Sequence, residues 1–156
     1  MILVRRLVFG LILVAGYGCT GPIGPIAGGE LAGENRPYPA SWNEAAAVEQ
    51  VQLETYETSG QPHSVNIWCV VHTDRLFFVT SLVRGEEMPE KRGWVQNALA
   101  NQAARVRVGE AIFEGNLNKI QDDALTSNVK DAFILKYDED TDERTQNAWV
   151  FEFVQP

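Results

Sequence analysis

Three basic side chains lie close together in the sequence, around the point where a helix is expected to begin. Arg84, Lys91 and Arg92 fall within nine positions of one another. Lysine and arginine side chains, together with the free backbone N–H groups of a helix start, are the groups that bind a phosphate. Thr80 and Ser81, at the end of the preceding expected strand, can add hydroxyl donors. The pattern therefore predicts a binding site for a phosphate group.

The same bases also admit a structural interpretation. Glu86, Glu87 and Glu90 stand among them, so three acids and three bases leave little net positive field. Clusters that bind a ligand and ion pairs that only stabilise a fold contain the same residue types. Solvated surface charges therefore remain an alternative to phosphate binding.

Other kinds of catalytic or metal site have no support in the residue pattern. His63 and His72 have no second His, Cys or carboxylate at ligand spacing, so no metal site is expected. The acidic run 138–143 has Glu143 where a calcium loop needs Gly, which indicates a solvated loop. Cys69, in the middle of an expected strand, is interpreted as a small buried hydrophobic residue. No Ser/His/Asp set, P-loop or Rossmann glycine pattern is present in the sequence.

The composition describes one acidic domain. A chain of 156 residues has room for a single domain and little more. The 21 acidic residues outnumber the 13 basic ones and give a net charge of −8, so no surplus of positive charge exists to bind nucleic acid. Four Trp, four Tyr and seven Phe within a 45% hydrophobic composition can build a core, which argues against disorder.

The beginning of the chain has the pattern of an export signal. Arg5 and Arg6 precede an apolar run from Leu7 to Ala15. This run is far shorter than the roughly 20 residues that a membrane-spanning helix needs. A signal peptide is therefore expected rather than a transmembrane helix.

The segment Gly16-Tyr17-Gly18-Cys19 resembles a relaxed bacterial lipobox, with Gly16 in place of the usual Leu. In a lipoprotein this Cys becomes the acylated first residue, and its lipid chains anchor the protein. We expect residues 1–18 to be removed and Cys19 to be lipidated; a secreted protein cleaved nearby is the alternative. Thr20 stands where an Asp would resemble an inner-membrane retention signal. The periplasmic face of the outer membrane is thus the expected place in the bacterial cell envelope.

The mature chain is expected to consist of a tether, 19–41, and a folded domain, 42–156. Residues 20–41 contain five Gly and four Pro without hydrophobic periodicity, which is typical of a linker. Removal of the signal takes away two arginines and no acid, so the net charge changes from −8 to −10. Anionic lipid repels such a surface, and we therefore expect the lipid at Cys19 to provide the contact with the membrane.

Hydrophobic periodicity in the domain predicts the element order βββαββαβ. Val51, Leu53 and Thr55 alternate with polar Gln52 and Glu54, which indicates a half-buried strand. The expected strands are 51–56, 65–71, 76–80, 104–108, 111–117 and 148–154, and the expected helices are 91–102 and a segment that starts at 122 or 123 and ends at 137. Antiparallel hairpins interrupted by two helices predict an α+β fold, a small six-stranded barrel with two outer helices.

The segment 65–117 resembles the split β-barrel of the pyridoxamine-phosphate-oxidase-like flavin proteins, and in particular their deazaflavin-dependent nitroreductase branch. The resemblance lies in the order of elements and in a few positions of the first helix and the hairpin after it. Those positions are Lys91, Arg92, Trp94, Asn97, Asn101, Val106-Arg107-Val108-Gly109 and Phe113-Glu114-Gly115. Gln102 departs from the family pattern, which often has Pro there.

The resemblance implies a homodimeric redox protein that binds FMN or a deazaflavin, with the cofactor phosphate near Thr80, Ser81, Arg84, Lys91 and Arg92. Trp94 can then stack on the flavin ring, although aromatic residues at helical spacing are more often part of the core. In such proteins the cofactor carries the hydride chemistry. A lipoprotein that keeps the barrel as a ligand- or protein-interaction scaffold without a cofactor is the alternative, because a fold does not determine a function.

Overall fold

The computed structural model describes residues 21–80, 89–137 and 147–156. The predicted site residues Cys19, Ser81 and Arg84 lie outside this part of the chain, as does the acidic run 138–143. The strands are β1 (Glu34–Arg36), β2 (Gln50–Tyr56), β3 (Pro62–His72), β4 (Arg75–Val79), β5 (Ala103–Val108), β6 (Ala111–Lys119) and β7 (Val150–Val154). The helices are α1 (Asn43–Ala47), the short 3₁₀ helix η1 (Pro89–Lys91), α2 (Gly93–Ala100) and α3 (Asp123–Tyr137).

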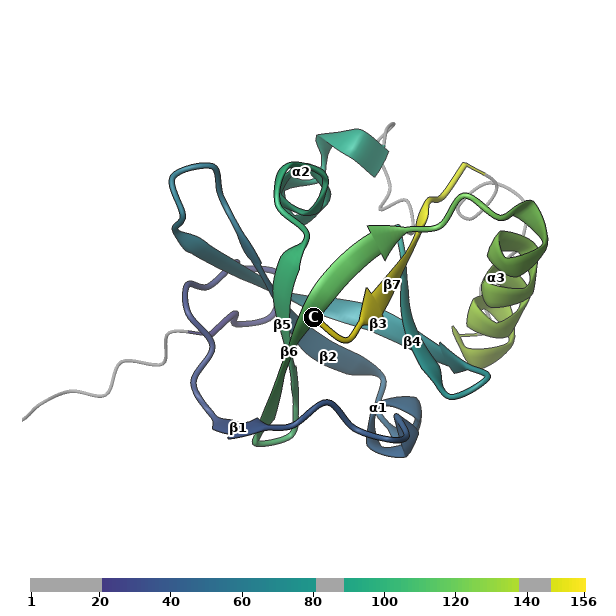
Figure 1. Cartoon of the computed structure of the whole chain (residues 1–156), viewed down its shortest axis with the longest axis horizontal. Coiled ribbons are helices and arrows are strands. Elements are labelled where there is room, and N and C mark those ends of the chain that lie inside the picture. Colours follow the sequence, from purple (N-terminus) through teal and green to yellow (C-terminus); the bar gives the residue numbers. More distant parts are fainter. Residues whose placement is uncertain (1–20, 81–88, 138–146) are drawn as a thin grey trace, which may run out of the picture.

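Six strands close into an antiparallel barrel, around which they follow the order β2-β3-β4-β7-β6-β5 (Figure 1). The short strand β1 is parallel to β6 and lies outside this ring. The barrel strands with α2 and α3 have the predicted order βββαββαβ, so the α+β barrel is confirmed. Strand β1 and helix α1 are additions that the hydrophobic pattern did not indicate.

Two tight turns fix the register of the hairpins. Thr73 and Asp74, between β3 and β4, have φ angles of 50° and 59°, and Gly109, between β5 and β6, has a φ of 59°. Positive φ values at the centre of a two-residue turn match the right-handed twist of the strands that it joins. The polar breaks between the expected strands, at residues 72–75 and 109–110, therefore lie at the turns of these hairpins.

Glycine at position 115 allows the barrel to close. A Cβ atom on Gly115 would lie 2.5 Å from the Cζ atom of Phe153 and 2.5 Å from the carbonyl oxygen of Val154. Gly115 is on β6, which pairs with β7 from Asn116 onward. The close approach explains why this position of the hairpin has no side chain.

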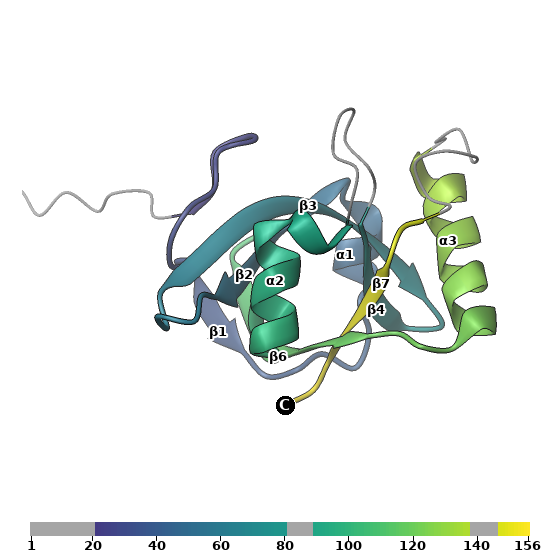
Figure 2. The ribbon, with the colours of Figure 1, turned by 90° about the horizontal axis from the view of Figure 1, so that it is seen from above.

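The barrel interior is filled by apolar side chains and covered at both ends. Helix α2 lies across one end and buries Trp94, Val95 and Ala98, while α1 contributes Ala45 and the preceding Trp42 at the other end (Figures 1 and 2). Both helices pack into the cluster of side chains that fills the barrel. The position of α2 is consequently fixed by its buried face.

Helix α3 packs on the outside of the barrel wall. It begins where predicted, because the Asp122 side chain accepts a hydrogen bond from the backbone N–H of Leu125 at 2.7 Å and caps the helix. Val129 and Phe133 of its apolar stripe are buried against the outer face of β3 and β4, which presents Val70 and Phe77 among others. Among the described residues, no helix has the length and apolar character to cross a membrane.

The segment before α1 lies along the barrel. The backbones of Gly28 and Ser64 exchange two hydrogen bonds of 2.8 and 2.9 Å, and the side chain of Leu31 is only 2% exposed. The hydroxyl group of Tyr38 donates to the carbonyl oxygen of Phe153 at 2.8 Å. Much of the Gly- and Pro-rich segment that we expected to act as a tether therefore contacts the folded domain in this structure.

Candidate functional site

Two of the predicted phosphate-binding bases lie at the start of α2. Arg92 is the residue that precedes the helix, and its backbone N–H donates to the carbonyl oxygen of Pro89 in η1 at 3.2 Å. The side chain of Arg92 forms no capping hydrogen bond with the first turn of α2. Lys91 is exposed and Arg92 is half-buried, so positive charge stands beside the N–H groups of this helix start.

Thr80 has a structural contact. It is 1% exposed, and its backbone N–H donates to the carbonyl oxygen of Trp149 at 2.9 Å. Its hydroxyl oxygen also accepts the backbone N–H of Trp149 at 2.7 Å. Thr80 thus extends the pairing of β4 with the segment that leads into β7.

Trp94 lies in the core at the end of the barrel that α2 covers. Its ring meets the ring of Phe151 edge to face, with 5.2 Å between the centroids. The side chain is buried together with Val95 and Ala98. This position makes Trp94 an anchor for the helix whose start carries Lys91 and Arg92.

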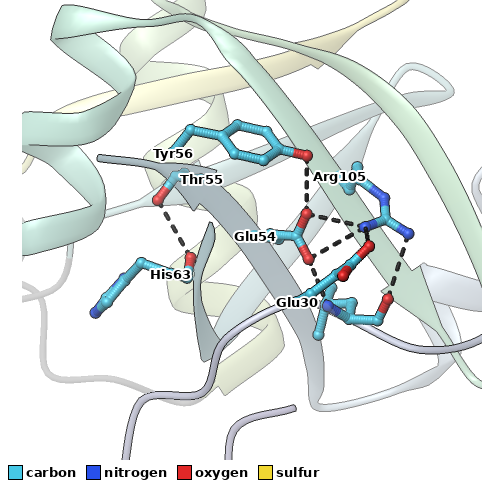
Figure 3. A network of polar contacts seen from close by, with 7 residues as sticks. Glu30, Glu54, Thr55, Tyr56, His63 and Arg105 are labelled. Carbon is cyan, nitrogen blue, oxygen red and sulfur yellow. Dashed lines mark hydrogen bonds and ion pairs between the residues drawn. The ribbon is translucent and has the colours of Figure 1, made fainter. Parts of the chain in front are cut away.

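His63 lies next to the start of α2, a proximity that the spacing of residues in the sequence did not indicate. His63 belongs to β3, and a Cβ atom on Gly93 would be 3.7 Å from its Cε1 atom. The Nδ1 atom of His63 is buried, and none of the described residues forms a hydrogen bond with it. The backbone carbonyl of His63 accepts the hydroxyl of Thr55 at 3.4 Å, a contact drawn in Figure 3.

A hydrogen bond also ties α2 to the barrel wall beside this place. The side-chain amide of Asn97 donates to the hydroxyl oxygen of Thr55 at 3.1 Å. Asn97 is one of the positions that carry the family resemblance, and its observed contact is with strand β2. Helix α2 is therefore held on the barrel by both an apolar face and a polar contact.

These residues fit the phosphate part of a flavin-type cofactor. An exposed lysine, a half-buried arginine and the first-turn N–H groups of α2 adjoin one another, and the ring of His63 lies beside Gly93 in that turn. Phosphate oxygens accept hydrogen bonds from all of these groups. The ring of such a cofactor would need a contact other than the face of Trp94, because that side chain belongs to the core.

A second charged cluster, shown in Figure 3, is buried in the barrel wall. The carboxylate of Glu54 is 0% exposed and accepts hydrogen bonds from the Leu31 backbone N–H, the Tyr56 hydroxyl at 2.8 Å and the Arg105 guanidinium at 3.0 Å. Arg105 also donates to the carbonyl oxygen of Leu31 at 3.3 Å and pairs with Glu30 at 3.6 Å. The cluster binds residues 30 and 31 to strands β2 and β5.

The alternation of apolar and polar residues in β2 did not predict the burial of Glu54. The alternation in β2 placed it with the polar residues of the strand, yet the segment around Leu31 covers it. Burial raises the pKa of the Tyr56 phenol to about 12, and the hydrogen bond to Glu54 adds to the shift. A buried carboxylate with a guanidinium partner and two further donors is a structural cluster. The Nε atom of Arg105 is buried in it and has no hydrogen-bond partner among the described residues.

Cys69 is buried, as expected from its place in a strand. Burial raises the pKa of its thiol to about 11, and nearby Lys136 opposes the shift. The ammonium group of Lys136 donates to the carbonyl oxygen of Cys69 at 2.9 Å, and the Tyr137 hydroxyl donates to the same oxygen at 2.7 Å. The thiol is therefore held in its protonated form at neutral pH. No group of three or more His, Cys, Asp or Glu side chains in the described residues is arranged to hold a metal ion.

Comparison with solved structures identifies the fold class of this barrel. HutZ, the heme storage protein from Vibrio cholerae, is 15% identical with a TM-score of 0.58, and the match covers 73% of this chain and 86% of that one. An F420 reductase is 15% identical with a TM-score of 0.54, covering 74% and 93% of the two chains. A NimC/NimA family protein from Clostridium acetobutylicum is 13% identical with a TM-score of 0.53, covering 72% and 76%. The chain is thus a split-barrel protein, as the resemblance implied.

Within that class the family is defined by the sequence. The model of the family described as "Uncharacterized protein conserved in bacteria (DUF2255)" matches residues 43–154. The chain belongs to this family. A search of curated proteins gave no match.

Proposed function

We propose that the chain is a cell-envelope lipoprotein whose split barrel binds FMN or a deazaflavin, with the cofactor phosphate at the start of α2. The observation that carries this proposal is the start of α2, where the Arg92 side chain forms no capping hydrogen bond and Lys91 stands exposed beside the first turn. Proteins of the same fold include an F420 reductase and a NimC/NimA family protein, which makes a redox role the first hypothesis to test.

The side chains at this place would bind and orient the phosphate. Lys91 and Arg92 would neutralise its charge, while the first-turn N–H groups of α2 would direct hydrogen bonds at its oxygens. The ring of His63, beside Gly93, would supply another N–H donor. When bound, a flavin or deazaflavin would supply hydride transfer, and the protein would supply binding and orientation.

The second candidate function is a scaffold that keeps the barrel without a cofactor. It is favoured by Thr80 and Trp94, because both are occupied in structural contacts. It is also favoured by the net charge of the mature chain, since an acidic protein attracts a phosphate-bearing ligand weakly at long range. The two candidates differ in whether a phosphate-bearing flavin or deazaflavin binds.

The absorbance spectrum of the purified full-length protein separates these candidates. A bound flavin or deazaflavin gives visible absorbance, and added cofactor raises the melting temperature of a protein that binds it only when folded. We expect a coloured protein, or a colourless one that is stabilised by FMN or by the deazaflavin. A colourless protein whose melting temperature responds to neither cofactor would support the scaffold and rule out the cofactor proposal.

The anchoring part of the proposal depends on Cys19. Acyl chains on this residue would hold the domain at the periplasmic face of the outer membrane, because each buried methylene adds to the attraction. We expect Cys19→Ala to release the protein into the soluble fraction of the cell envelope. An unchanged membrane fraction would contradict lipid anchoring.

A further inference from the structure

A tight turn near the beginning of the described chain exposes two isoleucines. Ile23 and Ile26 exchange backbone hydrogen bonds of 3.0 Å in both directions, and Gly24 has a φ of 55° at the bend. Their side chains are 67% and 68% exposed. This apolar turn, residues 23–26, contrasts with Leu31 a few positions later, which is buried on the barrel.

The apolar turn is attached to the barrel. The side-chain amide of Asn66 on β3 donates to the carbonyl oxygen of Gly24 at 3.0 Å. Two residues after the turn, Gly28 pairs with Ser64 on the same strand. Figure 2 shows the segment that contains the turn projecting from the barrel, on the side of the molecule opposite α3. The two isoleucines therefore have a defined place relative to the barrel.

The sequence places this turn beside the predicted lipid anchor. Ile23 is four positions after Cys19, so the two Cα atoms are separated by at most about 14 Å. No charged residue occurs from Thr20 to Gly29, although the mature chain has a net charge of −10 by the prediction above. Segment 20–29, next to the lipid anchor, thus exposes apolar side chains. It also has no acidic residue that anionic lipid would repel.

We propose that the apolar turn contacts the lipid bilayer beside the acylated Cys19 and sets the orientation of the barrel on the membrane. This inference rests on the proposed lipid anchoring. Transfer of two exposed isoleucine side chains from water into the membrane interface lowers the free energy. The acyl chains on Cys19 keep these side chains close to that interface. Because hydrogen bonds to Gly24 and Gly28 fix the turn to β3, insertion of the turn would hold that side of the barrel toward the lipid.

A fluorescent label at the turn tests the contact directly. The acylated mature Ile23→Cys variant, labelled with an environment-sensitive dye, is reconstituted in vesicles of phosphatidylethanolamine and phosphatidylglycerol. A matched label at Ser59→Cys, in the exposed turn between β2 and β3, is the control. Buried Cys69 should remain unlabelled in the folded protein. We expect lipids with nitroxide on the acyl chain to quench the label at position 23 at least twofold more than the label at position 59.

The outcomes separate this inference from the anchoring proposal. The mass of the N-terminal peptide reports whether Cys19 carries lipid. With lipid present, equal quenching at both positions overturns the membrane contact of the turn and leaves the anchor standing. A peptide without lipid overturns both proposals.

A pair of charge variants provides a second measurement. The double variant, Ile23→Asp with Ile26→Asp, should stay bound to vesicles through the lipid on Cys19. The protease should, however, cut its segment before Leu31 faster than that of the wild type on the same vesicles. Leu135→Asp, at an 86% exposed position on α3, should change nothing. A self-association of the wild type that the double variant abolishes, with no lipid dependence, would assign the turn to contact between copies and contradict the proposal.

Discussion

The barrel carries two basic sites that look similar in sequence and differ in structure. Arg105 contacts a fully buried carboxylate, and its guanidinium also bonds to Leu31 and Glu30. Lys91 is exposed at the start of α2, where the side chain of Arg92 forms no capping hydrogen bond. The comparison shows that the guanidinium of Arg105 is used in contacts that stabilise the fold, whereas the ammonium group of Lys91 is accessible to a ligand.

The largest effect is expected at the buried site. Arg105→Ala would leave the carboxylate of Glu54 without its charged partner, and such a change costs about 3–5 kcal/mol in the free energy of unfolding. Arg107→Ala on the same strand is the control, because its partner Glu110 is exposed and such pairs contribute about 0–1 kcal/mol. Urea unfolding followed by tryptophan fluorescence measures both.

The same experiment has a rescue variant. Glu54→Gln combined with Arg105→Met removes both charges; the amide oxygen can accept from the Leu31 N–H, and the amide NH2 can donate to the hydroxyl oxygen of Tyr56. We expect it to recover much of the lost stability, since a buried ion pair is often replaceable by uncharged groups. Equal stability of Arg105→Ala and Arg107→Ala would remove the distinction between the two basic sites.

A smaller loss is expected where the N-terminal segment meets the buried cluster. Leu31→Ala removes a 2% exposed side chain, and we expect a loss of about 2 kcal/mol, the lower end for a buried leucine. The segment before β1 should then be cut faster by protease. Leu135→Ala on α3, where the side chain is 86% exposed, should change stability by less than about 0.5 kcal/mol. Unchanged cutting in Leu31→Ala would mean that the segment does not depend on this contact.

The thiol of Cys69 tests whether interior polar groups are closed to solvent. Its folded pKa of about 11 exceeds the ordinary value of 9.0, so this residue contributes stability below pH 9 that is lost as the pH rises toward 11. We expect alkylation at pH 9 to be at least tenfold slower in the folded protein than in urea. Similar rates in the two states would show that the thiol is accessible.

The smallest stability effect is expected at the exposed site. Lys91→Gln should change the free energy of unfolding by less than about 0.5 kcal/mol, because surface substitutions of this kind are nearly neutral. Thermal unfolding without cofactor measures it. A large loss in the free energy of unfolding would mean that Lys91, like Arg105, stabilises the fold.

The order of the barrel strands and of the two longer helices followed from the sequence because those elements depend on local patterns. Alternation indicated β2, polar breaks marked the hairpins, and Asp122 marked the start of α3. The packing of residues 21–41 could not be inferred, because Gly and Pro give the same local signal in a free linker and in a segment held by distant contacts. The burial of Glu54 could not be inferred either, because the residue that covers it, Leu31, is 23 positions away in the sequence.

The candidate site was predictable in part. Residue type alone grouped Lys91 and Arg92 at a helix start, and the structure places them there. The proximity of His63 depends on how β3 lies against α2, which no local pattern contains. Thr80 and Trp94 have residue types that suit both a ligand and a core, and only the packing around Trp149 and Phe151 shows which contacts they make.

Titration of the full-length protein with FMN and with the deazaflavin tests the cofactor site most directly. Wild type is compared with Lys91→Gln, with Lys91→Gln plus Arg92→Gln, and with Arg107→Gln as a control that also removes one positive charge. We expect binding to the wild type and to the control, and a dissociation constant at least tenfold higher in the double variant, since a charge-assisted hydrogen bond contributes about 1.5–3 kcal/mol. Binding that is equal in all four proteins, or absent from the wild type, would contradict a phosphate site at the start of α2.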